Sequence, residues 1–435
     1  MVLIPISAYA APDCSGTSHD VKVWHFENVG PDGEIYIHTA EQLANIQQLA
    51  NLFIESDGHK GSLDFLTCPS NVYVLAQDID LPPGWTPIGD SDTHPDYVFK
   101  GSFDGRGHTI TGLTQGLFGS LDGARVSNLV IADANIKIST EETDAVGILA
   151  DNAKDSIIKN VSIENSEISA SGGGSGSVGG LVGRMEGTGL ILECHSHANV
   201  TGGIAGGLVG QVIGSSLTAN ANHKMEIIQS SATGKVVSLD GLAGGFIGEG
   251  VYALIKDCAA YGDVEGHTGA GGFVGRLSSR SRIIYAYARG NVSINGQSGF
   301  AGGFIGELTG SACVEFSYSV GSVFAAHTSA DAAIGGFVGI ISDVDAPNTI
   351  THSLSFSPWV VGDGYVHRFA GRMEHDGVNG CFAYLGSMVV RGGKLVDVIP
   401  SAYGSDGGDM SIAQVENITK RLGWRRNYAI SIASP

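Results

Sequence analysis

Two histidines at alternate positions are the first residues here whose type and spacing suggest metal chemistry. His195 and His197 alternate with Cys194 and Ser196, so on a strand both imidazoles would face outward together. Paired imidazoles can ligate a metal ion, but a closed zinc site needs four protein ligands. The sequence offers no identifiable third ligand, and we predict no metal site.

An acidic run is the second candidate, for a calcium ion. Ser139-Thr-Glu-Glu-Thr-Asp144 is rich in carboxylates but lacks the D-x-D-x-D-G spacing of an EF-hand. We interpret it as a solvated acidic loop, with weak Ca²⁺ binding as the alternative, and predict no cofactor. Asp104, which precedes Gly105, is interpreted as a turn residue rather than a catalytic acid.

A row of polar residues is the third candidate. Each residue of the row follows one copy of a recurring pentapeptide: Ser120, Asp151, Arg184, Gln211, Glu249, Arg276, Glu307 and Ile340. On stacked coils they would share one face at a spacing of about 4.8 Å. Charges alternate in sign around Arg276, which favours an ionic ladder that stabilises stacking. The alternative is a glycan-binding groove formed by Arg184, Gln211, Glu249, Arg276 and Glu307.

The position of this row depends on the pentapeptide, because each residue of the row directly follows one copy of it. It consists of a Gly-Gly pair, two apolar residues and a final Gly, and full copies begin at Gly179, Gly206, Gly244, Gly271, Gly302 and Gly335. Degenerate copies precede them at Gly116-Leu-Phe-Gly119 and Gly147-Ile-Leu-Ala150. Successive copies are 27 to 38 residues apart. A unit this short cannot bury its own apolar face, so the units must stack.

A second repeated element lies within each unit. It places a small residue six positions before a Val, at Cys194, Ser230, Cys258, Ala286 and Ser317. We expect these residues to form one inward ladder. Cys194 and Cys258 are then small buried side chains rather than nucleophiles or metal ligands.

These repeats predict an all-β chain folded as a right-handed parallel β-helix of about eight coils. A propeller blade needs about 40 residues, and leucine-rich spacing is absent. We expect glycine to supply positive φ at the corners and to permit close approach of adjacent coils.

A capping box near each end of the chain predicts a short helical cap there. Thr39-Ala-Glu-Gln42 opens a helix whose apolar face has Leu43, Ile46, Ala50 and Phe53, and which plugs the first coil. Ser411-Ile-Ala-Gln414 opens a second, with Ile412, Val415, Ile418 and Leu422, a stop at Gly423, and packing with Trp424. The expected domains are a signal-peptide remnant at 1–10, an N-terminal cap at 11–75, repeats at 76–360 and a C-terminal cap at 361–435.

The repeats resemble a known motif. Gly-Gly-Leu-Val-Gly and Gly-Gly-Phe-Ile-Gly are similar to the GLUG motif of bacterial surface and secreted proteins, including the β-helical region of immunoglobulin A proteases. Trp85-Thr-Pro-Ile-Gly89 and Phe99-Lys-Gly-Ser-Phe-Asp-Gly105 resemble the first coils of such domains. The resemblance covers about residues 75–360 and implies architecture rather than activity. The accompanying metalloprotease needs H-E-x-x-H, and Glu374-His375 lacks the second His.

Composition limits the function classes. The 435 residues include 65 Gly, only 16% are charged, and the formal net charge is −20. A 43% hydrophobic content argues against disorder. The acidity argues against nucleic acid as a partner and against attraction to anionic membranes. No segment has the run of 18 apolar residues that membrane insertion would need.

The beginning of the chain suggests export. Met1 to Ala10 is apolar and ends in an A-x-A cleavage pattern, Ala8-Tyr9-Ala10, so we interpret it as the end of a signal peptide. Secretion or surface display follows as an expectation. Cys14 and Cys68 lie outside the repeats and are the expected disulfide, if one forms.

Two functional classes stay open. The favoured one is a non-enzymatic, secreted or cell-surface module for adhesion, with a glycan or a host or bacterial surface protein as partner. The alternative is a secreted polysaccharide lyase or glycoside hydrolase with its site on one solenoid face. No local carboxylate pair, lyase cluster or G-x-S-x-G elbow stands out, so enzymatic activity is not predicted.

Overall fold

The computed structural model describes residues 33–54, 69–89, 97–139, 145–171, 176–216, 225–297, 299–325, 328–342, 348–411 and 413–414, with side chains of the helix up to residue 47. The predicted signal-peptide remnant, Cys14, Cys68, residues 140–144 of the acidic run and the body of the C-terminal helix lie outside the described residues.

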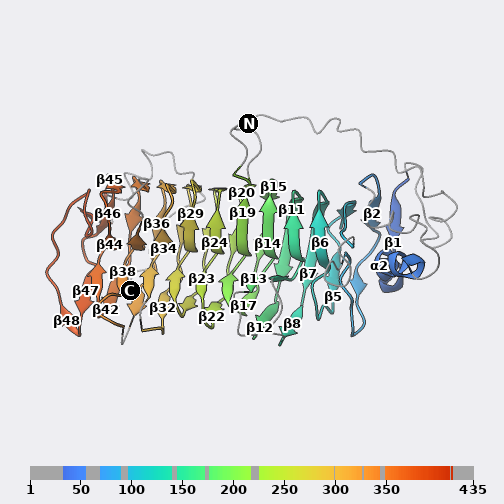
Figure 1. Ribbon diagram of the computed structural model, residues 1–435, viewed down its shortest axis with the longest axis horizontal. Coiled ribbons are helices and arrows are strands. Elements are labelled where there is room, and N and C mark those ends of the chain that lie inside the picture. The colour runs from blue at the N-terminus through green and yellow to red at the C-terminus, as the bar shows by residue number, and fades with distance from the viewer. Residues whose placement is uncertain are drawn as a thin grey trace.

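The described chain is a parallel β-solenoid, as the repeats predicted. A representative turn passes through four sheets with β13 (Ser177–Gly179), β14 (Val182–Gly187), the pair β15 (Gly189–Leu192) and β16 (His195–Ser196), and β17 (Asn199–Gly202). Each of these strands pairs in parallel with its equivalents one turn before or after. Figure 1 shows the result as an elongated rod, with α2 at one end and β47 (Met388–Arg391) and β48 (Lys394–Leu395) at the other.

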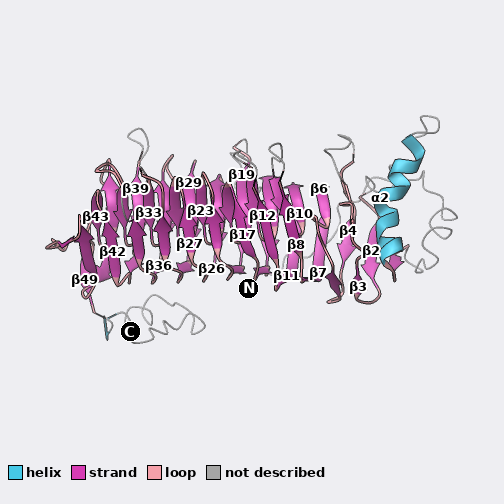
Figure 2. Cartoon of the chain, turned by 90° about the horizontal axis from the view of Figure 1, so that it is seen from below, coloured by secondary structure: helices cyan, strands magenta, loops and turns pink. Residues whose placement is uncertain are grey.

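One sheet follows the rod along most of its length and carries the polar row. Its nine parallel strands are β6 (Phe118–Asp122), β10 (Ala150–Lys154), β14, β19 (Val209–Gly214), β24 (Ile247–Val251), β29 (Val274–Ser278), β34 (Ile305–Leu308), β39 (Val338–Ile341) and β44 (Ala370–Met373). Figure 2 shows these strands stacked side by side with those of the other sheets. The described solenoid has about nine turns, close to the expected eight.

The apolar pair of each pentapeptide fills the interior. The first residue of the pair is Leu208 in one turn and Phe in the next four copies, and Phe369 occupies the equivalent position one turn further. The rings of Phe246, Phe273, Phe304, Phe337 and Phe369 stack at 4.8 to 4.9 Å between centroids. All five rings are fully buried. One residue type repeated at the strand spacing therefore builds a continuous aromatic column along the axis of the rod.

The expectation of positive φ at the corners holds for other glycines, such as Gly112, Gly123 and Gly187, but not for those of the pentapeptide. The pentapeptide glycines do not have positive φ; a Cβ on Gly271 would instead collide with the Val274 carbonyl and approach the Gly306 nitrogen to 2.6 Å. Positive φ also occurs at non-glycine residues, and eight of these lie at one repeated bend: Asn128, Asn160, Glu193, Gln229, Asp257, Tyr285, Phe316 and His352. Neighbouring side chains offset this unfavourable conformation: Asn160 donates to Asn128 at 2.9 Å, and the rings of Phe316 and His352 stack.

The N-terminal helical cap is confirmed. The helix α2 (Ala40–Ile54) begins where the capping box predicts, because the Thr39 hydroxyl accepts from the Gln42 backbone N–H at 3.1 Å. The Gln42 side chain in turn accepts from the backbone N–H of His38 at 2.7 Å. Leu43 and Ile46 are fully buried, and α2 lies across the end of the rod (Figure 2).

The C-terminal end of the described solenoid is held by charged groups. Arg368 is fully buried and donates to the Asp409 carboxylate at 2.8 Å. Asp406 accepts from the backbone N–H groups of Arg368 and Ile399 and contacts the His367 imidazole at 3.3 Å. Burial acts to raise the pKa of the Asp406 carboxyl, but these hydrogen bonds and the neighbouring imidazole lower it below its ordinary value of 3.8.

Acid should therefore weaken this end of the rod. Because the folded pKa of Asp406 lies below the unfolded value, its contribution is complete above about pH 4 and is lost as the pH falls through the folded pKa. Asp406→Asn should cost about 1–2 kcal/mol at pH 7 and progressively less below pH 4. Urea unfolding from pH 7 to pH 3 measures this, with exposed Asp331→Asn as the control. An equal cost of Asp406→Asn at both ends of the pH range would contradict the assignment.

Candidate binding face

The five predicted residues of the polar row lie side by side in the nine-stranded sheet. Arg184 pairs in register with Gln211, Gln211 with Glu249, Glu249 with Arg276, and Arg276 with Glu307. Each of these residues follows the last Gly of its pentapeptide. The closely packed Gly-Gly corner therefore places the residue after it on the same face of the nine-stranded sheet in every turn. The row is half-buried rather than fully exposed.

Three hydrogen bonds and one ion pair connect the whole row across five turns. Arg184 Nε donates to Gln211 Oε1 at 3.0 Å, and Gln211 Nε2 donates to Glu249 Oε2 at 2.7 Å. Arg276 then lies between two carboxylates, with Nη1 at 3.5 Å from Glu249 Oε1 and Nε at 2.7 Å from Glu307 Oε2. The neutral amide of Gln211 thus links a cation to an anion, accepting from one and donating to the other.

Electrostatics support a pairing role for these groups. The Glu249 and Glu307 side chains are only 16% and 17% exposed, against 36% for Arg276. Burial acts to lower the pKa of the Arg276 guanidinium, but the hydrogen bonds and charges of Glu307 and Glu249 outweigh burial and raise that pKa. Both carboxylates face a permanent cation, which is the arrangement of an ionic ladder.

Sequence reasoning misplaced one member of the row and missed another contact. Asn152, not Asp151, pairs in register with Ser120 and Arg184. The degenerate copy at Gly147 aligns with the first Gly of the full pentapeptide rather than the second, which shifts the following residues by one position. Ser342 is an addition: its hydroxyl donates to Glu307 Oε1 at 2.9 Å from a position the repeat pattern does not mark.

The two histidines that the sequence analysis considered as metal ligands face outward, as the alternation of side chains along a strand predicts. His195 and His197 are both exposed, and His195 Nδ1 lies 2.9 Å from the Ser231 hydroxyl. Burial, followed by the nearby His197, lowers the pKa of His195. No group of three or more His, Cys, Asp or Glu in the described part of the chain is arranged to hold a metal ion. Asp104 is the last residue of β4 (Ser102–Asp104), directly before the turn, and accepts from the Arg106 N–H at 3.0 Å.

The small-residue ladder is confirmed. Cys194, Ser230, Cys258, Ala286 and Ser317 are all buried, and the Cys194 N–H donates to the Ser230 hydroxyl at 3.1 Å. Burial raises the pKa of both the Cys194 and the Cys258 thiol to about 12. These thiols are thus protonated packing groups at neutral pH, which disfavours nucleophilic chemistry.

An apolar cluster on the outside of the rod was missed. Tyr287 and Tyr318 stack at 5.0 Å between ring centroids, and Leu354 and Phe356 pack with them. The guanidinium of Arg289 lies over the Tyr287 ring at 5.6 Å. The sequence did carry a signal, because each Tyr stands between two small inward residues and must therefore face outward.

Reversing the charge of Arg276 should destabilise the rod mainly through the polar row. Arg276→Glu would place three carboxylates on successive turns, and we expect a loss of about 1–2 kcal/mol in the free energy of unfolding. The loss should shrink in 1 M salt, because salt screens half-exposed charges. Urea unfolding at two salt concentrations measures it. Arg282→Glu breaks a single ion pair, with Glu315, that is more exposed to solvent, and it should cost less stability. Equal losses of stability in the two variants, unchanged by salt, would contradict the ionic ladder.

Comparison with known proteins shows that part of the chain is similar in sequence to IgA1 proteases. Residues 97–165 match the family model for the N-terminal region of the M26 IgA1-specific metallo-endopeptidases. This match supports the expected likeness to IgA proteases, while assignment to the GLUG motif stays a prediction. No helix in the described residues has the length and apolarity to cross a membrane.

The individual proteins that this chain resembles share 16% to 30% sequence identity with it. Halomucin of Haloquadratum walsbyi is 30% identical in an alignment 154 residues long, which covers 31% of this chain and 2% of halomucin. The chain therefore corresponds to a small part of that relative. A solved structure of a putative immunoglobulin A1 protease from Bacteroides ovatus is 17% identical, with a TM-score of 0.42 over 93% of this chain and 91% of that one. An IgA1 protease structure is 16% identical, with a TM-score of 0.44 over 82% of this chain and 24% of that one.

Proposed function

We propose that this chain is a secreted or surface-displayed solenoid module that acts by binding, in adhesion or in interaction with a host or bacterial surface. Its expected partner is a glycan or a surface protein. The observation that carries the proposal is the polar row: across five turns its charged and amide groups are hydrogen-bonded to one another. The row thus stiffens a rod, and a stiff rod suits display and contact.

The comparisons support the extracellular part of this proposal. The matched family model belongs to endopeptidases specific for IgA1, an extracellular immunoglobulin, and another relative is named as a mucin. Both similarities therefore favour a secreted or surface-displayed protein. The acidic net charge of −20 would keep such a rod soluble.

A test must separate binding from catalysis. The purified chain is applied to an array of glycans, to immobilised mucin and to immobilised IgA1, and both retained protein and released product are measured. We expect saturable retention on at least one surface, with no time-dependent release of reducing sugars or unsaturated products. Time-dependent product release would overturn the proposal in favour of a polysaccharide lyase or hydrolase. Absence of retention on every surface would also count against it.

The polar row offers a matched variant for the same assay. Arg276→Glu should lower stability while leaving retention unchanged, if the row serves stacking alone. Loss of retention in a variant that is still folded would instead assign the binding groove to Arg184, Gln211, Glu249, Arg276 and Glu307.

A further inference from the structure

We propose that the cavity between α2 and the first turn of the solenoid is a saccharide pocket that takes a single pyranose ring. The inference rests on the proposed function, for which it names a site and a ligand class. The cavity has a volume of about 280 Å³ and is lined by Ala40, Glu41, Ala44, Gln47, Pro82, Gly84, Trp85 and Thr86. This volume lies just below the range of about 300–1,000 Å³ for small-molecule pockets, which fits one sugar ring better than a longer ligand.

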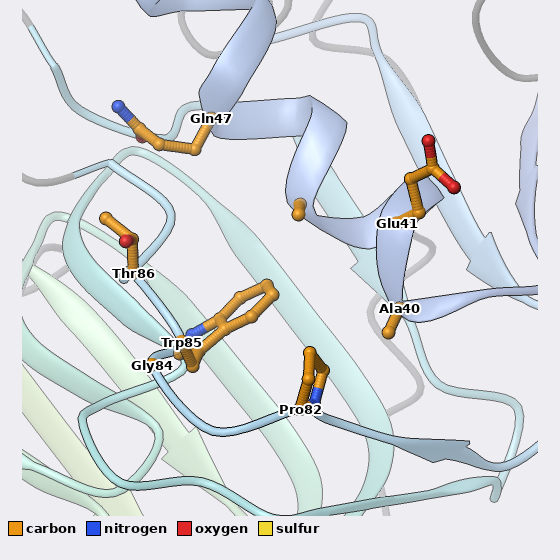
Figure 3. Close-up of a pocket in the computed structure, with 8 residues that line it drawn as sticks. Ala40, Glu41, Gln47, Pro82, Gly84, Trp85 and Thr86 are labelled. Carbon is orange, nitrogen blue, oxygen red and sulfur yellow. The ribbon is translucent and has the colours of Figure 1, made fainter.

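The aromatic wall of the cavity is held rigidly. The Trp85 indole is only 5% exposed, and its Nε1–H donates to the Gly116 carbonyl at 3.2 Å. Figure 3 shows the Trp85 ring directed from the loop of residues 82–86 toward the first turns of α2. Fixing the ring in advance lowers the entropic cost of binding a ligand against it.

The helical wall is held by a second long-range bond. Gln47, 3% exposed, accepts from the backbone N–H of Gly89 at 2.7 Å. Gly89 has φ of +75°, and a Cβ there would lie 2.7 Å from the Ser120 carbonyl, so only glycine suits this position. The helix and the first turn are thereby joined on one side of the cavity, which keeps its shape without a ligand.

The lining combines the two kinds of group that a sugar needs. Pro82, Ala40, Ala44 and the indole supply apolar surface for the C–H face of a pyranose. Glu41 and Thr86 are exposed residues at the rim of the cavity, and their carboxylate and hydroxyl can hydrogen-bond the outer hydroxyls of a sugar. A small organic cation would use the indole and Glu41 but would leave the hydroxyl of Thr86 without a role.

The test uses the full chain and methyl glycosides of glucose, galactose, mannose and N-acetylglucosamine as probes. Saturation-transfer NMR should detect saturable binding of at least one glycoside, with a Kd around 1 mM, as expected for so small a ligand. Glu41→Gln should weaken binding by about tenfold through loss of a charge-assisted hydrogen bond. Ala44→Phe should fill the cavity and abolish binding. Glu167→Gln, on the exposed side of β12 (Glu167–Ala170), is the matched control and should bind as the parent does.

Several outcomes would contradict the proposed saccharide pocket without contradicting the proposed surface-binding function. Binding of no glycoside, or equal binding by Ala44→Phe and the parent chain, would remove the proposal, provided that thermal unfolding shows the variants folded. Tighter binding of choline than of any glycoside would make the cavity a cation site instead. Retention of Ala44→Phe on mucin or IgA1 separates the two proposals. If the pocket variant is retained but binds no glycoside that the parent chain binds, the pocket stands and surface adhesion uses another face.

Discussion

Phe304→Ala is expected to lower the free energy of unfolding by about 3–5 kcal/mol. The ring is fully buried in the aromatic column, parallel to Phe273 at 4.9 Å and to Phe337 at 4.8 Å between centroids. Its removal would leave a cavity that rigid turns on both sides cannot close. Because each turn contacts only its neighbours, the loss should also weaken coupling between the two halves of the rod.

Urea-induced unfolding and calorimetry measure this effect. Phe324→Ala is the matched control, since Phe324 is 41% exposed on β37 (Val323–Ala325) and should cost no more than about 0.5 kcal/mol. Phe304→Leu should be intermediate, because Leu208 occupies the same position of an earlier turn. Equal losses in Phe304→Ala and Phe324→Ala would contradict the role of the column.

Gly271→Ala is expected to cost about 3 kcal/mol, the second large effect. Gly271 ends β28 (Gly269–Gly271) at the corner of a pentapeptide, where an added Cβ would meet the Val274 carbonyl and the Gly306 nitrogen. Both obstacles are backbone atoms of paired strands, so neither can move without breaking ladder hydrogen bonds. The reason for glycine here is space rather than φ.

Gly250→Ala provides the control for this substitution. Gly250 lies inside β24, and an added Cβ would approach only the flexible Leu277 side chain, at 3.1 Å. We expect a change within about 1 kcal/mol, measured by the same urea titration. If Gly271→Ala were tolerated as well as Gly250→Ala, close approach would not explain the repeated Gly-Gly pair.

The sequence by itself determined the solenoid and five consecutive members of the polar row. In a parallel solenoid, equivalent positions of successive repeats lie next to each other in one sheet. The repeat pattern in the sequence therefore predicts which residues are in contact. Arg184, Gln211, Glu249, Arg276 and Glu307 were predicted together for this reason, and the ladder of Cys194 and Ser230 likewise. The capping box likewise located α2, because its hydrogen bonds are local in sequence.

Only the tertiary structure decided what depends on contacts between different parts of a turn or between turns of unequal length. The one-position shift that puts Asn152 in the row comes from strand register, which a degenerate pentapeptide does not define. The pairing of the buried Arg368 with the exposed Asp409 joins residues 41 positions apart. The cavity at Trp85 exists because a helix packs across an end of the solenoid, and no periodicity along the chain encodes that approach.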